Sequence, residues 1–192
     1  MSDSPKRAGF APARKIVFAA ATVVASVTIL ATASAAPITS GKTVIKPDQD
    51  TFEALADMSI GVEPTGAAKF GHNGFKFPVS GGKTGGQSGK TIIDHRGGIA
   101  FFTEGGPSVK FSKFEIQAGN KVKVFAKSNH AAVRFLDIKG GQVSGTDTSL
   151  TVKGSKVTLA KAGAGVLSET FNADIQKGVP IGTGNLKATV GG

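Results

Sequence analysis

The sequence predicts a mainly β protein, an antiparallel sandwich or curled sheet with two short helices, that follows an N-terminal signal segment. From residue 75 onward, short segments of β-forming residues are separated by glycine, and most of them alternate with a period of two. Two other stretches show a helical period instead. The first 35 residues have the composition of an export signal. Together these observations define one β-rich domain behind a signal peptide.

The N-terminal segment contains the three parts of a signal peptide in the required order. Cationic residues gather at 6–15, and an uncharged run extends over 16–33. An Ala-Ser-Ala sequence at 33–35 is an A-x-A cleavage signal, so we expect a signal peptide of residues 1–35 and a mature chain that begins at Ala36. The alternative is an uncleaved membrane anchor, because the run is just long enough to span a bilayer. In both cases the domain faces outward.

The predicted mature chain, residues 36–192, is long enough to form a single domain with its own core. The signal segment holds four cationic residues and one acidic residue, so its removal lowers the net charge from +10 to +7. The absence of cysteine excludes a lipid-anchored lipoprotein and a disulfide framework. We expect a secreted or envelope-associated mature form that does not span the membrane, because the sequence ends at Gly192 without a hydrophobic tail or sorting motif.

The composition also narrows the choice of partners. The aromatic residues are 13 Phe, with no Trp and no Tyr. Carbohydrate and single-stranded nucleic-acid sites usually stack rings on Trp or Tyr, so both are disfavoured and we expect no nucleic-acid partner. A basic surface outside the cell attracts an anionic cell-wall polymer, acidic glycans or membrane headgroups. Solubility alone is the simpler explanation of this charge.

The expected elements follow from periodicity and capping. A first helix is predicted at Gln49–Asp57, with Asp48 as its N-cap, and a second at 161–172. The alternation within 108–117 changes phase after Phe111, which predicts a β-bulge near Ser112 or Lys113. The expected strands are 43–46, 60–62, 75–79, 90–95, 98–103, 108–117, 121–127, 131–139, 149–153 and 181–190. The expected core comprises Phe111, Phe114, Val122, Val124, Val133, Phe135, Leu159 and Leu167.

Catalytic motifs are absent from the sequence. It has no cysteine nucleophile, no H-E-x-x-H zinc motif and no G-x-S-x-G elbow. TGGQSGKT at 84–91 lacks the first glycine of a phosphate loop, and strand-forming residues follow it where a helix is required. A glycosidase pair would have to come from Asp94, Glu104, Glu115 and Asp137, but no Trp or Tyr is present to hold a sugar. We therefore expect a protein that is not an enzyme.

His95 is the candidate binding residue. It ends the apolar segment IIDH, immediately before a turn at Gly97 and Gly98. One interpretation is a turn histidine that bonds to the backbone, and the other is a ligand or a supporting residue of a binding site. The sequence leaves both open. His72 and His130 are too far from His95 in the sequence to predict a metal site.

Three blocks of the sequence occur in the order found in a known family. They are KFGHNGFKFPVSGG at 69–82, KTIIDHRGGIAFF at 90–102 and KVTLAKAGAGVLSETFN at 156–172. They resemble the HtaA family, the haem-transport-associated domains of secreted and cell-surface proteins in Gram-positive bacteria. The middle block is similar to the family's G-H-x-G between two strands, although Asp94 replaces the first glycine. The last block is similar to its T-L-T-x-x-G-A-x-x-F helix, so the resemblance implies the family's β-rich fold over about residues 70–185.

The resemblance implies a domain that binds haem through a tyrosine near its N-terminus, supported by a histidine whose motif matches His95. This chain departs from the family there, because the opening W-x-x-x-x-S-F-x-x-Y segment is replaced and the chain has no tyrosine. Either His95 or His72 could ligate the iron in place of the tyrosine, or the domain has kept the fold and lost the cofactor. Two functions follow. One is a haem-binding or haem-transfer module of the envelope, with haem or a haem-carrying protein as its partner; the other is a cofactor-free surface protein that binds an anionic cell-wall polymer or a partner protein.

Processing of the signal segment can be tested by intact-mass measurement of the protein from a secreting host. We expect a mass that corresponds to a chain beginning at Ala36, because cleavage should follow the A-x-A signal. Recovery only in the membrane fraction, with residues 1–35 retained, would show that the segment is an anchor.

Overall fold

The computed structural model describes residues 35–85, 90–129 and 131–191. The predicted signal peptide lies outside these residues except for Ala35, and so do residues 86–89 and His130. Within the described part of the chain, no helix has the length and apolar character needed to cross a membrane.

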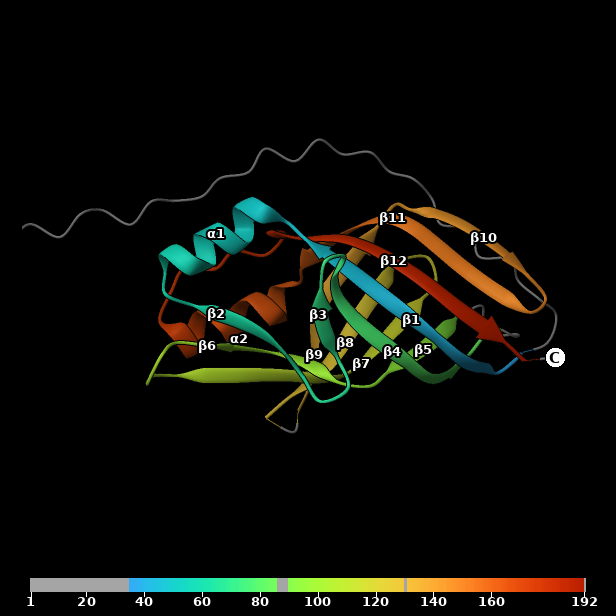
Figure 1. The fold of residues 1–192 in the computed structure, drawn as a ribbon, viewed down its shortest axis with the longest axis horizontal. Helices are drawn as coiled ribbons and strands as arrows, with labels where there is room; N and C mark the ends of the chain where they lie inside the picture. Colours follow the sequence, from blue (N-terminus) through green and yellow to red (C-terminus); the bar gives the residue numbers. More distant parts are fainter. Residues whose placement is uncertain (1–34, 86–89, 130, 192) are drawn as a thin grey trace, which may run out of the picture.

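Eight antiparallel strands close into a barrel (Figure 1). Around the wall they are β7 (Ser108–Ala118), β5 (Thr91–His95), β4 (Gly74–Lys83), β1 (Ile38–Pro47), β12 (Pro180–Val190), β11 (Ser149–Leu159), β9 (Ala131–Lys139) and β8 (Val122–Ser128). The pairing of β8 with β7 closes the circle. The mainly β composition and the two helices are confirmed, whereas a barrel replaces the expected sandwich or curled sheet. Alternation specifies which face of a strand is buried, and it does so equally in a sandwich and in a barrel.

Four further strands lie outside the barrel wall. β6 (Gly98–Phe102) pairs with β7, and β2 (Gly61–Thr65) pairs with β6. The short strands β3 (Lys69–Gly71) and β10 (Gln142–Thr146) pair with β4 and β11. The sequence did not predict β3 and β10, whose residues carry no apolar alternation.

A β-bulge divides β7 into two parts. Up to Ser112 the strand pairs with β6, and from Glu115 onward it pairs with β5. On its other edge it pairs with β8, with a register shift between Ser112 and Glu115. Lys113 lies between these parts with a positive φ of 53°, and its backbone N–H bonds to the Gly97 carbonyl. The predicted bulge near Ser112 or Lys113 is therefore confirmed. It turns one long strand from the barrel wall into the β6–β2 extension.

The two helices gather with β2 and β6 at one end of the barrel (Figure 1). α1 (Gln49–Asp57) has the predicted bounds, and the Asp48 side chain accepts a hydrogen bond from the Thr51 N–H as the predicted N-cap. α2 (Lys161–Phe171) confirms the second helix and packs against β9. A Cβ at Gly163 would lie 2.5 Å from the Phe135 carbonyl oxygen, so the glycine allows this close approach.

Phenylalanine rings form the centre of the core. Phe111 and Phe135 are 0% and 1% exposed, and their rings stack with centroids 4.0 Å apart. Six of the eight expected core residues are buried, whereas Val122 is only partly buried. Val133 is also partly exposed, because a register shift between β8 and β9 makes Phe135 and Leu136 both buried and so breaks the simple alternation. The sequence pattern alone contained no sign of this shift.

Phe135→Ala should lower the free energy of unfolding by about 3 to 5 kcal/mol, because it empties the space between three packed rings. Chemical denaturation of the mature protein measures this loss. Val133→Ala is the control on the same strand and should lower stability by less than about 1 kcal/mol. Equal losses in the two variants would mean that the inward face of β9 is misassigned.

Candidate functional site

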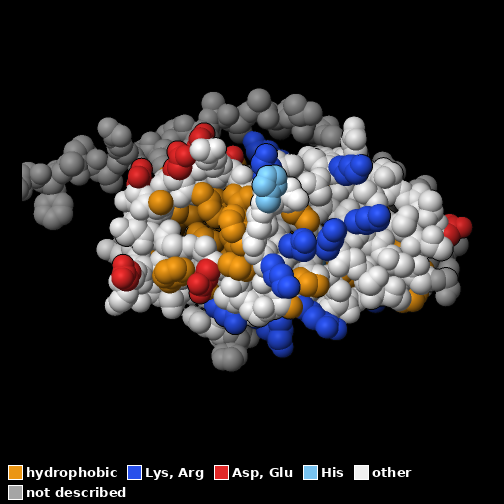
Figure 2. Space-filling model, viewed as in Figure 1, with side chains coloured by type: hydrophobic (Ala, Val, Ile, Leu, Met, Phe, Trp, Pro, Cys, Tyr) orange, Lys and Arg blue, Asp and Glu red, His pale blue; other side chains and the backbone are white. Residues whose placement is uncertain are grey.

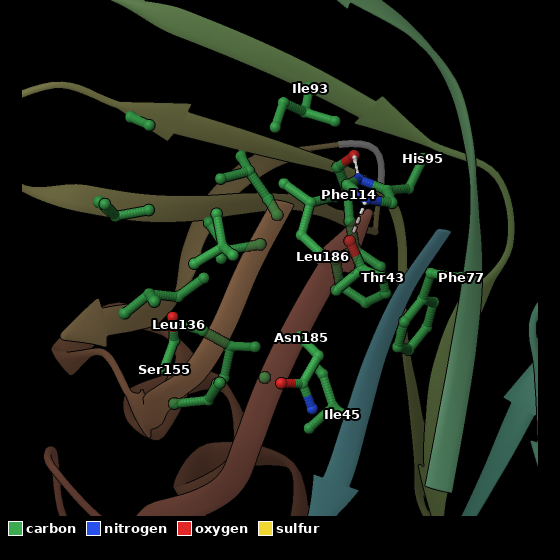
Figure 3. Close-up of a pocket in the computed structure, with 18 of the residues that line it drawn as sticks. Thr43, Ile45, Phe77, Ile93, His95, Phe114, Leu136, Ser155, Asn185 and Leu186 are labelled. Carbon is green, nitrogen blue, oxygen red and sulfur yellow. Dashed lines mark hydrogen bonds between the residues drawn. The ribbon is translucent and has the colours of Figure 1, made fainter. Parts of the chain in front are cut away.

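The inside of the barrel contains a small apolar cavity. Its volume is about 80 Å³, and all eight barrel strands contribute to its lining. Side chains such as Ile93, Phe114, Leu136 and Leu186 point into it (Figure 3). Sites for small molecules usually have volumes of about 300 to 1,000 Å³, so this cavity does not hold a haem-sized ligand in the described structure.

His95 lies in the wall of this cavity and is 5% exposed. Its Nε2 lies 2.7 Å from the Thr43 hydroxyl on β1, and its Nδ1 lies 3.3 Å from the Phe114 carbonyl oxygen on β7 (Figure 3). A carbonyl oxygen only accepts hydrogen bonds, so Nδ1 carries the proton and Nε2 accepts from the Thr43 hydroxyl. Both ring nitrogens of His95 are therefore engaged.

Burial lowers the pKa of His95 from 6.5 to about 4. Hydrogen bonds to the backbone of Phe114 and Ile93 act in the opposite direction but are outweighed. The imidazole is accordingly neutral at physiological pH, which is the form that ligates metals. Ligation of iron through Nε2 would, however, require the ring to release Thr43 and the barrel wall to open. Direct ligation by His95 stays a prediction.

Thr43 is the partner that the sequence analysis did not identify. The segment TVIK places Thr43 in phase with Ile45, and both residues are buried. A threonine at an inward position of an apolar strand needs a hydrogen-bond partner, and this was the available signal. The partner itself lies 52 residues further along the chain, so only the fold brings the two side chains together.

His72 occupies a different environment, at the tip of the β3–β4 hairpin. Its side chain is exposed, and its Nδ1 lies 3.3 Å from the Asn73 side-chain oxygen. That oxygen accepts the Nδ1 proton, which leaves the lone pair on Nε2. Gly74 allows this hairpin to lie against β1, since a Cβ there would lie 2.2 Å from the Ile45 carbonyl oxygen. His72 thus presents an imidazole nitrogen to solvent on a short, supported hairpin.

An exposed apolar surface lies beside this hairpin. Phe70 is 59% exposed, and its ring packs 4.7 Å from that of Phe75. The ring of Phe52 on α1 lies 6.0 Å from that of Phe75, and Met58 at the end of α1 is 42% exposed. We call Phe52, Met58 and Phe70 the Phe70 surface. Figure 2 shows an apolar area at the α1 end of the molecule, with acidic side chains around it at that end and with a histidine and lysines or arginines on its barrel side.

The four carboxylates considered for a glycosidase pair do not form one around the cavity. Asp94 and Glu115 lie opposite each other on β5 and β7, and the pKa of Asp94 is raised by burial and by the charge of Glu115. Asp137 pairs with Arg134, and Glu104 is exposed in a turn. None of the four lines the cavity. Among the described residues, no group of three or more His, Cys, Asp or Glu side chains is placed to hold a metal ion.

Comparison of the structure with solved proteins supports the family resemblance. The C-terminal domain of HtaA from Corynebacterium glutamicum superposes with a TM-score of 0.66 at 16% identity, over 81% of this chain and 99% of that domain. The chain has the HtaA-domain fold. The N-terminal HtaA domain, at 11% identity, gives 0.58 over 81% and 99% of the two chains. The haem-binding protein HtaB of the same bacterium, also at 11%, gives 0.54 over 82% and 96%.

No family model and no curated protein matches the sequence. The likeness to HtaA domains is thus carried by structure, at an identity that establishes the fold alone. Within this HtaA-like fold, the first resembling block forms β3 and β4, the second forms β5 and β6, and the third forms the end of β11 and α2. His95 is the last residue of β5. This position agrees with the family pattern, in which the G-H-x-G motif lies between two strands.

The HtaA-like domain should lose stability as the pH falls from about 6.5 to about 4. Its folded state holds His95 neutral in this window, whereas the unfolded chain binds a proton there, so acid favours unfolding. The contribution of His95 is about 3 kcal/mol when fully lost. Denaturation of wild type and His95→Gln across this pH range measures it.

His95→Gln should be less stable at neutral pH but should show a flatter pH dependence. His72→Gln is the matched control, because it removes a histidine at an exposed position and should keep the wild-type pH profile. Identical profiles for wild type and His95→Gln would contradict the buried neutral state of His95.

Proposed function

We propose that the mature chain is an exported, non-enzymatic haem-binding module of the cell envelope that takes haem at the β3–β4 hairpin. The HtaA-like fold and the haem-binding protein HtaB among its structural neighbours support a haem ligand. The observation that carries the location is the exposed imidazole of His72 beside the Phe70 surface. The signal segment supports export.

The residues present fit haem at the hairpin better than inside the barrel. The chain has no tyrosine to supply a phenolate, and the barrel cavity is too small for a porphyrin. At the hairpin, His72 supplies an imidazole whose Nδ1 side is held by the Asn73 side-chain oxygen and whose Nε2 is open to a ligand. Phe70 supplies an exposed ring against which a porphyrin can pack.

Charge around the hairpin suits the carboxylates of haem. Lys69 and Lys76 lie opposite each other on β3 and β4, one residue beyond the Phe70–Phe75 pair. Both lysines are exposed. Hydrogen bonds from an ammonium group to a carboxylate are stronger than those between neutral groups, so these lysines favour an anionic ligand over a neutral one of the same shape.

The arrangement favours exchange of haem over storage. When bound, haem would supply an iron centre that accepts axial ligands. The protein side of the site consists of one exposed imidazole, an apolar surface open to solvent and two surface lysines. Such a site buries little of its ligand and releases it readily, which is the behaviour required of a transfer module.

His95 has a separate role in this proposal. Its two hydrogen bonds connect β5 with β1 and with β7, three strands of one side of the barrel. It therefore positions the wall from which the β3–β4 hairpin extends, without contact to haem. Ligation of the iron by His95 is the competing assignment, and titration of variants with haemin distinguishes the two.

Titration of the mature protein with haemin should give a saturable one-to-one shift of the Soret band. His72→Ala should weaken this binding by at least about tenfold, because it removes the axial nitrogen. Phe70→Ala should weaken it by a smaller factor. His95→Gln should keep the Soret spectrum, provided that circular dichroism shows a folded barrel.

The opposite pattern among the variants would assign the iron ligand to a different histidine. A saturable spectrum that is lost in His95→Gln and unchanged in His72→Ala would assign the iron to His95. The absence of any saturable spectrum in the wild-type protein would overturn haem binding and leave the cofactor-free alternative.

A further inference from the structure

One side of the barrel surface is basic, and the strands that form it contain no acidic residue; Asp147 lies in the turn that joins β10 to β11. It comprises β3, β4, β1, β12, β11 and β10, which are neighbours in the sheet. No Asp or Glu occurs in these six strands. Their eight exposed lysines, which we call the lysine face, are Lys42, Lys46, Lys69, Lys76, Lys83, Lys153, Lys156 and Lys187.

Pairs of like charge oppose each other within this face. Lys42 lies opposite Lys187 across β1 and β12, and Lys69 lies opposite Lys76 across β3 and β4. Lys156 on β11 faces a further cation, Lys139 on β9. Like charges directly opposite on adjacent strands destabilise a sheet. The ion pair found among the described residues, Arg134–Asp137, involves none of these lysines.

The acidic residues are concentrated elsewhere. Five of them lie at the α1 end, on the helix, its N-cap and β2. Figure 2 shows lysines and arginines across the barrel and most of the visible acidic side chains at the other end of the molecule. A charge that served solubility alone would not need to be separated in this way, nor to place lysines opposite one another. These five residues are Asp48, Asp50, Asp57, Glu53 and Glu63.

We propose that the lysine face binds a linear polyanion, an extended polymer with repeated anionic groups along its length. The lysines extend over five adjacent strands, from β3 to β11, whose spacing of about 4.8 Å gives a row about 20 Å long. Ammonium groups on flexible stems suit repeated point charges, without the geometric demands that arginine would impose. The lysine face shares Lys69 and Lys76 with the proposed haem site, but the proposal does not rest on haem binding.

A polymer fits this face better than a membrane or a nucleic acid. The large exposed apolar side chains among the described residues are Met58, which follows α1, and Phe70, which lies on β3 at the edge of the lysine face. The described parts of β1, β12 and β11 carry no such side chain. A membrane-bound surface would need apolar side chains to insert between headgroups. Base stacking would need aromatic side chains among the cations, and β1, β11 and β12 contain none.

The face continues past Lys139 to a basic hollow. This hollow has a volume of about 610 Å³, and its lining includes Arg134, Lys139, Lys161 and Lys177. Asp137 also contributes to the lining but is paired with Arg134. A chain of anionic groups that follows the lysine face therefore meets further cations at this end of its path.

The test compares two variants that lose the same charge. One replaces four residues of the lysine face, Lys42, Lys76, Lys156 and Lys187, with glutamine. The control replaces four other exposed lysines with glutamine: Lys90 before β5, Lys110 on β7, Lys121 before β8 and Lys127 near the end of β8. Binding of fluorescently labelled long-chain polyphosphate is measured by anisotropy at several salt concentrations, with tripolyphosphate and phosphatidylglycerol vesicles as separate probes.

We expect long-chain polyphosphate to bind wild type with an affinity that falls as salt rises, and tripolyphosphate to bind much more weakly. The lysine-face variant should bind at least about tenfold more weakly and with a shallower salt dependence, whereas the control should stay within about twofold of wild type. The melting temperature of the lysine-face variant should be equal to or above that of the control, because the variant removes like charges that lie opposite each other.

Three results would overturn the proposal. Equal weakening in both variants would show attraction by net charge alone. Binding to vesicles but not to polyphosphate, lost in the lysine-face variant, would assign the face to a membrane. A lysine-face variant that melts well below the control would mean that these lysines stabilise the fold, which contradicts a face kept for binding at a cost in stability.

Discussion

Closure of the barrel is the constraint on which the rest of this structure depends. Once β8 pairs with β7, the inward side chains of eight strands must fill one enclosed space, and they leave a cavity of only about 80 Å³. Any larger ligand is thereby confined to the outer surface. The bulge at Lys113 makes closure compatible with the extension, because it lets one strand serve the wall and the β6–β2 sheet in turn.

The interior is apolar apart from a few polar side chains, and His95 is the largest of them. A neutral imidazole that donates to the Phe114 carbonyl and accepts from Thr43 meets its hydrogen-bonding needs without a charge. Burial then keeps it neutral by lowering its pKa. This histidine therefore couples the integrity of three strands to pH, whether or not haem is present.

On the outside, the molecule separates two kinds of chemistry. The Phe70 surface and the imidazole of His72 lie at the end that carries α1, where apolar contact and a nitrogen ligand come together. The lysine face covers the neighbouring strands and holds like charges opposite one another. In the two proposals, the lysine face attaches the domain to an anionic polymer and the hairpin exchanges a small anionic ligand. The β3–β4 hairpin belongs to both, since Phe70 lies between Lys69 and His72.

The sequence by itself determined the local elements. α1 has the predicted bounds because its N-cap and apolar stripe lie within ten residues of one another, and the bulge in β7 was visible as a change of phase. Five core residues and the mainly β class followed from strand alternation, and the core residue Leu167 followed from the helical period of α2. What only the tertiary structure decided is everything that joins distant parts of the chain: closure of the barrel, the register shift between β8 and β9, the Thr43–His95 pair and the opposition of Lys42 and Lys187. Alternation records which side of a strand is apolar, but it does not record which strand lies next to it, and that choice sets both the curvature of the sheet and the neighbours of every polar side chain.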